Sequence, residues 1–201
     1  MKSLFSILAG FVLGGALLCL PLMARAQGYP QAGTRQPDET QSNKQNVSPL
    51  SQRDKTFVDK AAQGGLSEVE LGNLAMQKAT NPDVKKFAER MVHDHSQVNK
   101  ELNQLADREG ITLPKRLSAK DEMLKDQLEK LNGEAFDKAY MQNQVQDHEK
   151  DIAAFQHESR DGQNASVKEF ASQTAPLLQS HLQEAESVTP KVQAARNSGT
   201  R

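Results

Sequence analysis

Apolar residues recur every three to four positions through most of the chain after residue 53, which is the spacing of one face of an α-helix. No segment shows the sustained alternation of apolar and polar residues that is typical of β-strands, so the pattern disfavours a barrel or a sandwich. We therefore predict an all-α protein. One of the helical stripes consists of Val84, Ala88, Met91, His95, Val98 and Leu102.

Capping and turn residues divide this pattern into four long helices and one short helix. Asn81 supplies an N-cap and Pro82 stands at the first helical position, which marks a tight hairpin between two helices. Gly110 and Gly162 end helices, and Pro190 is expected to stop the last one. The predicted helices cover residues 54–79, 82–109, 118–131, 134–160 and 165–188.

The connection formed by residues 110–133 decides the predicted topology. The long helix before it is roughly 40 Å long at about 1.5 Å per residue. A short helix of about 20 Å and about ten extended residues can cross that length from end to end. We predict a ferritin-like four-helix bundle, up-down-down-up, with a long crossover that carries the short extra helix. Simple up-and-down packing is the alternative.

The first 26 residues have the composition of an export signal. Lys2 precedes an apolar run from Leu4 to Leu22, and Ala24-Arg25-Ala26 has the small-residue pattern of a cleavage site. No later segment approaches the ~18 consecutive apolar residues of a membrane-spanning helix. We expect a periplasmic or secreted protein, and the sequence lends no support to association with the outer membrane.

The rest of the chain divides by composition. Residues 27–52 are rich in Gln, Ser, Asn, Pro and Gly, which predicts a disordered leader. Residues 53–190 are predicted to form one helical domain of ordinary size, and residues 191–201 a flexible tail. The only cysteine, Cys19, lies in the export signal, so the exported chain has no thiol for a disulfide or a thiolate metal site.

Charge and aromatic content exclude some partners. The chain has a formal net charge of −1, and removal of the export signal with Lys2 and Arg25 makes it more acidic. The sequence has no basic patch of the kind that binds nucleic acid, and the absence of Trp disfavours a platform for stacked bases. We expect no nucleic-acid partner. An unidentified envelope protein that binds a bundle face or the leader is an alternative.

Three of the five histidines lie on inward-facing helical stripes. The pattern Val-x-Asp-His occurs twice near the middle of long helices and ends at His95 and His148, and His181 lies on the inner stripe of the last helix. Because His95 and His148 lie about equally far from the starts of their helices, we expect them to share one level of the bundle. His93 and His157 lie on charged faces and are predicted to be surface residues.

A carboxylate from the first helix is expected to complete this group. Glu68 is the one charged residue on the inner stripe of that helix, and Glu70 is its competitor on a neighbouring face. One carboxylate and three imidazoles can bind a divalent zinc, iron, manganese or copper ion. A buried Glu–His hydrogen-bond network without metal is the alternative. Asp94 and Asp147 are interpreted as exposed acids rather than as groups that orient a ligand. The predicted metal ligands are Glu68, His95, His148 and His181.

Four segments give the chain a family resemblance: Gly64–Gly72 (GGLSEVELG), Phe87–His95 (FAERMVHDH), Phe136–Met141 (FDKAYM) and the stretch Leu177–Leu182 around His181. Over residues 54–188 the chain resembles the exported bacterial family known as domain of unknown function 4142 (DUF4142). The resemblance implies a ferritin-like helical fold and the label of a predicted outer-membrane protein, with no established activity.

One departure from ferritin-like di-iron proteins narrows the predicted function. Those proteins carry Glu-x-x-His on two helices, whereas Val92 and Val145 stand three residues before His95 and His148. Two metal ions would have too few anionic ligands, which argues against ferroxidase, iron-storage and oxygen-activating di-iron chemistry. We favour a non-enzymatic exported bundle that serves metal handling or envelope-stress tolerance. A metal-dependent redox enzyme and a metal-free adaptor are the alternatives.

Overall fold

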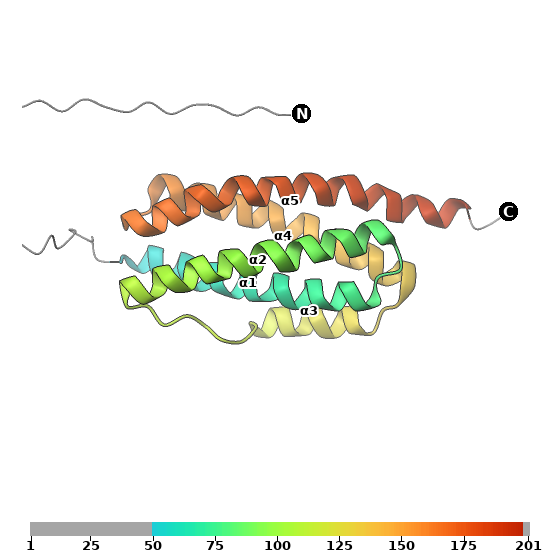
Figure 1. The fold of residues 1–201 in the computed structure, drawn as a ribbon, viewed down its shortest axis with the longest axis horizontal. Coiled ribbons are helices and arrows are strands. Elements are labelled where there is room, and N and C mark those ends of the chain that lie inside the picture. The colour runs from blue at the N-terminus through green and yellow to red at the C-terminus, as the bar shows by residue number, and fades with distance from the viewer. Residues whose placement is uncertain (1–49, 199–201) are drawn as a thin grey trace, which may run out of the picture. The chain divides into compact units, whose positions relative to one another are not determined.

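The computed structural model describes residues 50–198, and this part of the chain is helical, without a β-strand. The all-α prediction is therefore confirmed. The predicted export signal and residues 27–49 of the predicted leader lie outside the described residues. None of the helices within residues 50–198 has the length and apolar character that crossing a bilayer requires. The helices are α1 (Gln52–Lys78), α2 (Pro82–Glu109), α3 (Ala119–Glu129), α4 (Gly133–Asp161) and α5 (Ala165–Ser198) (Figure 1).

Side-chain caps explain where several helices begin. Ser51 Oγ accepts a hydrogen bond from the Asp54 backbone N–H at 3.1 Å, and the Asp54 carboxylate accepts one from the Ser51 N–H at 2.9 Å. This reciprocal capping box starts α1 inside the predicted leader, because it satisfies backbone donors that helix formation leaves free. Asn81 and Asn164 cap α2 and α5 through their side-chain oxygens. α2 ends at Gly110, which adopts the left-handed conformation at φ 67°.

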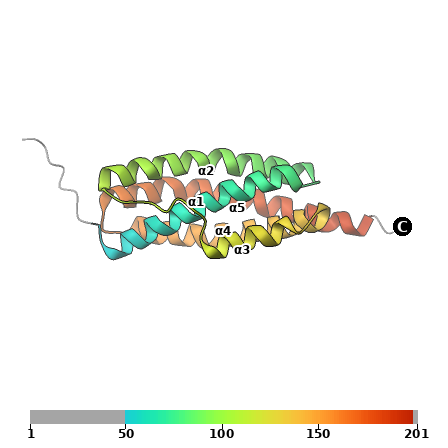
Figure 2. The same cartoon turned by 90° about the horizontal axis from the view of Figure 1, so that it is seen from below.

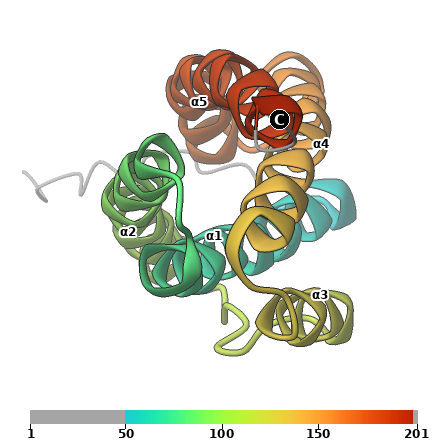
Figure 3. The same ribbon diagram turned by 90° about the vertical axis from the view of Figure 1, so that its right-hand side faces the viewer.

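Contacts between helix ends define how the four long helices run. The Asp137 carboxylate of α4 accepts a hydrogen bond from the Thr80 backbone N–H after α1, and Asp54 at the start of α1 accepts one from the Gln163 N–H after α4. α1 and α4 are therefore antiparallel. Lys191 of α5 pairs with Asp83 of α2 at 2.9 Å, so α2 and α5 are antiparallel as well. In Figure 3, the α1–α2 and α4–α5 hairpins lie side by side.

The connection between α2 and α4 returns along the outside of the long helices. Residues 110–118 and α3 run beside α1 and α4 (Figure 2). Leu128 is the buried residue of α3, and Lys125 forms an ion pair with Glu70 of α1 at 2.8 Å. This crossover lets α2 and α4 run in the same direction, because it brings the chain back to the end of the molecule at which α2 begins before α4 starts.

The end of the chain differs from the sequence prediction. α5 continues to Ser198 and contains both Pro176 and Pro190, so the predicted helix end at Val188 is wrong. A proline removes one backbone donor from a helix. Here the segment beyond Pro190 is held by tertiary contacts, since Val192 is buried in the core and Lys191 pairs with Asp83. These contacts offset the local cost of the proline.

Two apolar clusters fill the core, and a polar layer separates them. On α2, His95 lies between Met91 of one cluster and Val98 of the other. On α5, His181 lies in the same way between Leu178 and Ala185. The buried polar residues of this layer are Glu68, His95, Gln144, His148 and His181.

Glycines let α1 approach α2 closely. An ideal Cβ atom at Gly72 would lie 2.7 Å from Cγ2 of Val92 and 3.2 Å from the carbonyl oxygen of Ala88. At Gly65 the Asn99 side chain occupies the corresponding space, and its amide donates a hydrogen bond to the Gly65 carbonyl at 2.9 Å. The close packing of these two helices therefore depends on the absence of side chains at both positions.

Candidate metal centre

Three buried histidines converge in the polar layer. His95 of α2, His148 of α4 and His181 of α5 each offer one ring nitrogen, and these nitrogens all lie within 4.8 Å of one another. The ring centroids are 5.8 Å apart for His95 and His148, 5.2 Å for His95 and His181, and 5.3 Å for His148 and His181. The three residues are 4%, 2% and 0% exposed, in chain order. Solvent therefore does not satisfy their ring nitrogens.

Hydrogen bonds fix which nitrogens of two histidines carry protons. His148 Nδ1 lies 2.9 Å from the Gln144 carbonyl oxygen, and His181 Nε2 lies 2.9 Å from an Asp94 carboxylate oxygen. A carbonyl and an ionised carboxylate only accept hydrogen bonds, so we assign an N–H group to each of these outer nitrogens. In neutral imidazoles the inner nitrogens, Nε2 of His148 and Nδ1 of His181, then carry lone pairs. These two atoms face each other at 3.3 Å.

His95, the third ring of the cluster, contributes another nitrogen that receives no hydrogen bond. Nε2 of His95 is buried and has no hydrogen-bond partner among the described residues. Moving a proton to an inner nitrogen of His148 or His181 would instead leave an outer lone pair against the Gln144 carbonyl or the Asp94 carboxylate. Buried polar atoms are normally satisfied, so this unsatisfied cluster requires an explanation.

Burial keeps the imidazoles uncharged. It lowers the pKa of His95 to about 3 and that of His148 to about 4, and the adjacent His181 ring lowers the pKa of both further. Burial also lowers the pKa of His181, although the Asp94 carboxylate acts against this effect. At neutral pH no additional proton bridges the facing nitrogens. The cluster therefore presents uncharged nitrogen donors, which is the form of imidazole that binds metal ions.

Asp94 of α2 orients His181 of α5, and side chains from both helices hold the Asp94 carboxylate in place. Burial alone would raise the pKa of Asp94, but hydrogen bonds from His181, His93 and Arg90 outweigh it and lower the pKa to about 2. Arg90 also donates hydrogen bonds to Glu184 and Ser180 of α5. The Asp94 side chain is 18% exposed, so the interpretation of this residue as an exposed acid is wrong. A carboxylate that fixes a histidine in this way is the usual outer partner of a metal ligand.

The structure leaves Glu68 outside the histidine group. Its carboxyl is buried beside Gln144 and Asp147 of α4, and its Oε2 atom has no hydrogen-bond partner among the described residues. Burial, and then the charge of Asp147, raise the pKa of Glu68 well above its ordinary value. Burial also raises the pKa of Asp147, which lines a groove instead of projecting freely into solvent. The environment of Glu68 therefore disfavours the charged form of its carboxyl.

The remaining sequence candidates lie at the surface. Glu70 is half exposed and forms an ion pair with Lys125, so it does not replace Glu68 in the core. The side chains of His93 and His157 are 85% and 56% exposed, which confirms their prediction as surface residues. His93 Nδ1 nevertheless donates a hydrogen bond to the Asp94 carboxylate at 2.8 Å, and so lies on the outer side of the carboxylate that holds His181.

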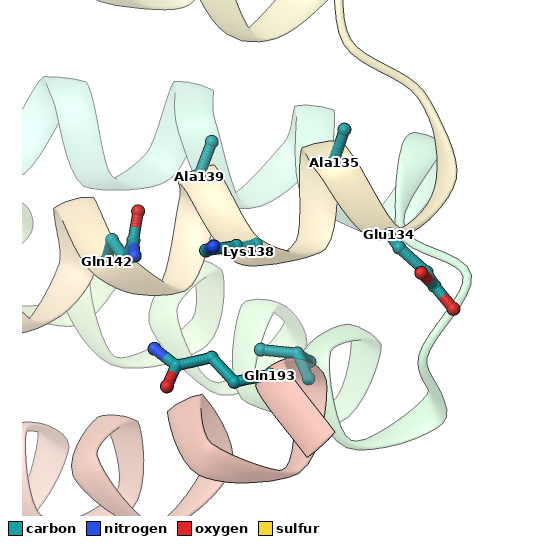
Figure 4. A pocket seen from close by; sticks show the side chains of 7 residues that line it. Glu134, Ala135, Lys138, Ala139, Gln142 and Gln193 are labelled. Carbon is teal, nitrogen blue, oxygen red and sulfur yellow. The ribbon is translucent and has the colours of Figure 1, made fainter. Parts of the chain in front are cut away.

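Two concave surfaces lie apart from the histidines. A pocket of about 420 Å³ is formed by the start of α4 and the end of α5, and Figure 4 shows Glu134, Lys138, Gln142 and Gln193 at its wall. A groove of about 820 Å³ lies along α1 and α4 and includes Phe57. No histidine of the cluster lines either surface, so the convergent nitrogens belong to the closed core of the protein.

The outer contacts of the histidines were missed by the sequence analysis. Asp94 directly precedes His95, so its helical position suggested a different face, and nothing in the local pattern indicates that it contacts His181 on α5. The Gln144 carbonyl is one turn before His148 and is a general feature of helices. Only the repeated Asp-His pair hinted at a carboxylate near the site.

The chain belongs to the family described as domain of unknown function (DUF4142), whose model matches residues 39–188. This finding confirms the resemblance of the sequence motifs. No curated protein matches the chain.

Solved structures with similar folds include a DUF305 fragment from Deinococcus radiodurans, with a TM-score of 0.63 and 14% identity over 71% of this chain and 99% of that one. A DUF305 protein from Streptomyces coelicolor, described as a candidate secreted protein, has a TM-score of 0.60 and 11% identity over 70% and 92% of the two chains. CopM in a silver-bound form has a TM-score of 0.56 and 14% identity over 69% and 96%. A Cu(II)-bound form of CopM is also similar. At these identities the comparisons establish a shared helical fold alone.

Proposed function

We propose that the chain is an exported, non-enzymatic protein with a ferritin-like four-helix bundle, up-down-down-up, whose core binds one metal ion through His95, His148 and His181. The proposed role is metal handling or metal tolerance in the bacterial envelope. The observation that carries the proposal is the pair of facing nitrogens of His148 and His181, whose outer N–H groups are committed to a carbonyl and a carboxylate. The antiparallel hairpins and the crossover through α3 support the bundle class.

The spacing of the two nitrogens supports this proposal. Nitrogen ligands at about 2.0–2.1 Å from a tetrahedral ion lie about 3.3–3.4 Å apart. Nε2 of His148 and Nδ1 of His181 are 3.3 Å apart. A shared ion would replace the repulsion between two lone pairs by two coordinate bonds, and it would also give His95 Nε2 a partner.

The donor set favours late transition metals. Imidazole suits zinc, copper, iron and nickel, whereas manganese prefers the oxygen donors that this group lacks. The CopM structures contain silver and Cu(II), which supports copper as the first metal to test in a protein of similar fold. The predicted export signal supports a periplasmic or secreted location, where a metal-handling protein would meet its ion.

Metal analysis combined with thermal melting tests the proposal. Protein purified from the exported fraction without a polyhistidine tag is expected to contain or bind one equivalent of metal, and an ion at 100 times its Kd should add about 2.7 kcal/mol of stability. His95→Ala, His148→Ala and His181→Ala should each lose binding at least tenfold, whereas His157→Ala, at an exposed position away from the cluster, serves as the matched surface control.

A metal-free polar network is the competing function of the same residues. In that network one of the two facing nitrogens would carry a proton, and the 3.3 Å contact of His148 with His181 would be a hydrogen bond. In that case the melting temperature would not respond to zinc, copper, iron or manganese. Each core substitution would then cost about 1 to 3 kcal/mol, the value of a buried hydrogen bond, without any metal dependence. That result would overturn the metal-binding proposal.

A further inference from the structure

We propose that this centre selects a singly charged ion, cuprous copper, over a divalent ion such as zinc. The inference rests on the metal-binding function proposed above and identifies the class of ion. Cu(I) and Zn(II) both have ten d electrons, so neither has a geometric preference that arises from a partly filled d shell. The comparison between them therefore isolates the effect of charge.

The three ligands supply no negative charge. All are neutral imidazoles, and the two candidate carboxylates lie elsewhere, because Glu68 is outside the group and Glu70 pairs with Lys125. The ion would occupy a core position among residues that are 0–4% exposed. The cost of moving an ion from water into such an environment rises with the square of its charge, so a divalent ion pays about four times the penalty of a monovalent ion of similar radius.

The charges just outside the ligands match an ion of single charge. Asp94 contacts His181 at 2.9 Å, but Arg90 contacts the same carboxylate at 3.2 Å and also pairs with Glu184. Together Arg90, Asp94 and Glu184 carry one net negative charge. The positive charge of Arg90 lies close to the ligand, since Arg90 donates a hydrogen bond to the carboxylate oxygen of Asp94 that contacts His181. The charge of Arg90 also repels a cation that approaches the ligands, and the energy of this repulsion is twice as large for a divalent ion as for a monovalent one.

The other nearby carboxylate does not change this balance. Asp147 precedes His148 in the chain but faces the groove along α1 and α4, where Lys120 and Lys150 are its cationic neighbours. Asp147 is therefore directed to the groove rather than to the ligands. The outer group of Arg90, Asp94 and Glu184 remains the main source of charge next to the ligands.

Competition titrations of the full exported chain test the inference. The affinities for Cu(I), held under anaerobic reducing conditions, and for Zn(II) are measured against chromophoric chelators, and the ratio of the two dissociation constants is compared between variants. Cu(I) is expected to bind at least 100-fold more tightly than Zn(II). Arg90→Gln should shift the ratio toward Zn(II) by about tenfold, because the outer group then carries two net negative charges.

Two further variants separate charge from fold. Glu184→Gln leaves the outer group with no net charge and should shift the ratio toward Cu(I), in the opposite direction to Arg90→Gln. Arg108→Gln on the exposed face of α2 is the matched control and should leave the ratio unchanged. A ratio that favours Zn(II), or one that neither variant alters, overturns charge selection. Failure of the parent protein to bind any ion overturns the proposed function instead.

Discussion

The buried carboxyl of Glu158 allows the electrostatics of the fold to be tested away from the histidines. The residue is 2% exposed, its Oε1 atom has no hydrogen-bond partner among the described residues, and the Asp54 carboxylate is its neighbour. Burial, and then Asp54, raise the pKa of Glu158 from 4.5 to about 7. An acid with a raised folded-state pKa stabilises the fold when protonated, and that contribution is lost as the pH rises from 4.5 through 7.

Glu158→Gln should therefore stabilise the protein at alkaline pH. The amide has the shape of the protonated acid and can donate a hydrogen bond to Asp54. The shift in pKa corresponds to at most ~3 kcal/mol at pH 8. The pKa of about 7 already includes the opposing charge of Arg53 at 3.9 Å. Because solvent screening reduces such a gain, we expect about 2 kcal/mol, or about 4–8 °C in Tm.

Urea denaturation at pH 8 and pH 5 measures this effect. At pH 5 the gain should fall to about a quarter of its value at pH 8, since most of the wild-type acid is then protonated in the folded state. Glu149→Gln, at an exposed position of the same helix, should change the free energy of unfolding by less than ~0.5 kcal/mol at either pH. A loss of stability in Glu158→Gln at pH 8, or an equal gain at both pH values, would refute the reasoning.

Three other predictions follow from the packing and the burial of the core. Gly72→Ala should destabilise the protein by about 1 to 3 kcal/mol because its Cβ would overlap Val92, whereas Gly64→Ala, with its nearest atom at 3.5 Å, should be neutral or stabilising in the same denaturation assay. Val192→Ala should lower the free energy of unfolding by about 1 to 2 kcal/mol because Val192 is buried in the core, whereas removal of the exposed Lys191 charge should lower it by less than ~0.5 kcal/mol. Metal affinity measured by titration should fall less between pH 7 and pH 5 than the affinity of exposed histidines, because burial lowers the pKa of all three imidazoles, to about 3 for His95 and about 4 for His148. A decline centred at the ordinary histidine pKa of about 6.5 would point to exposed ligands.

Helical periodicity predicts which face of a helix is buried, but not which buried side chains contact one another. The burial of His95, His148 and His181 could be predicted because side chains recur on one face every three to four residues. Glu68 is on the predicted inner face too, yet it lies beside Gln144 rather than with the imidazoles. The histidines and Glu68 share the polar layer, but which side chains meet within it depends on the packing of α1 against α4, which no local pattern in either helix records.

Features that depend on distant segments were predicted least well. Asp94 appears as a surface acid when α2 is considered alone, and its role emerges only when α5 brings His181 against it. Pro190 is a reasonable local signal for a helix end, but the packing of Val192 and the ion pair of Lys191 continue α5 beyond it. In both cases tertiary contacts outweigh the local preference of the residue.

The polar layer between the two apolar clusters also limits how the helices can slide. A shift of α5 by one turn moves its side chains by about 5.4 Å, which would carry His181 out of the layer and into hydrocarbon, away from Asp94. Apolar side chains such as Leu178 and Ala185 tolerate such a shift, because they exchange one hydrophobic neighbour for another. An imidazole separated from its carboxylate does not, because a buried polar group without a partner is costly. The polar layer therefore favours one register of the helices over the registers that are shifted by one turn.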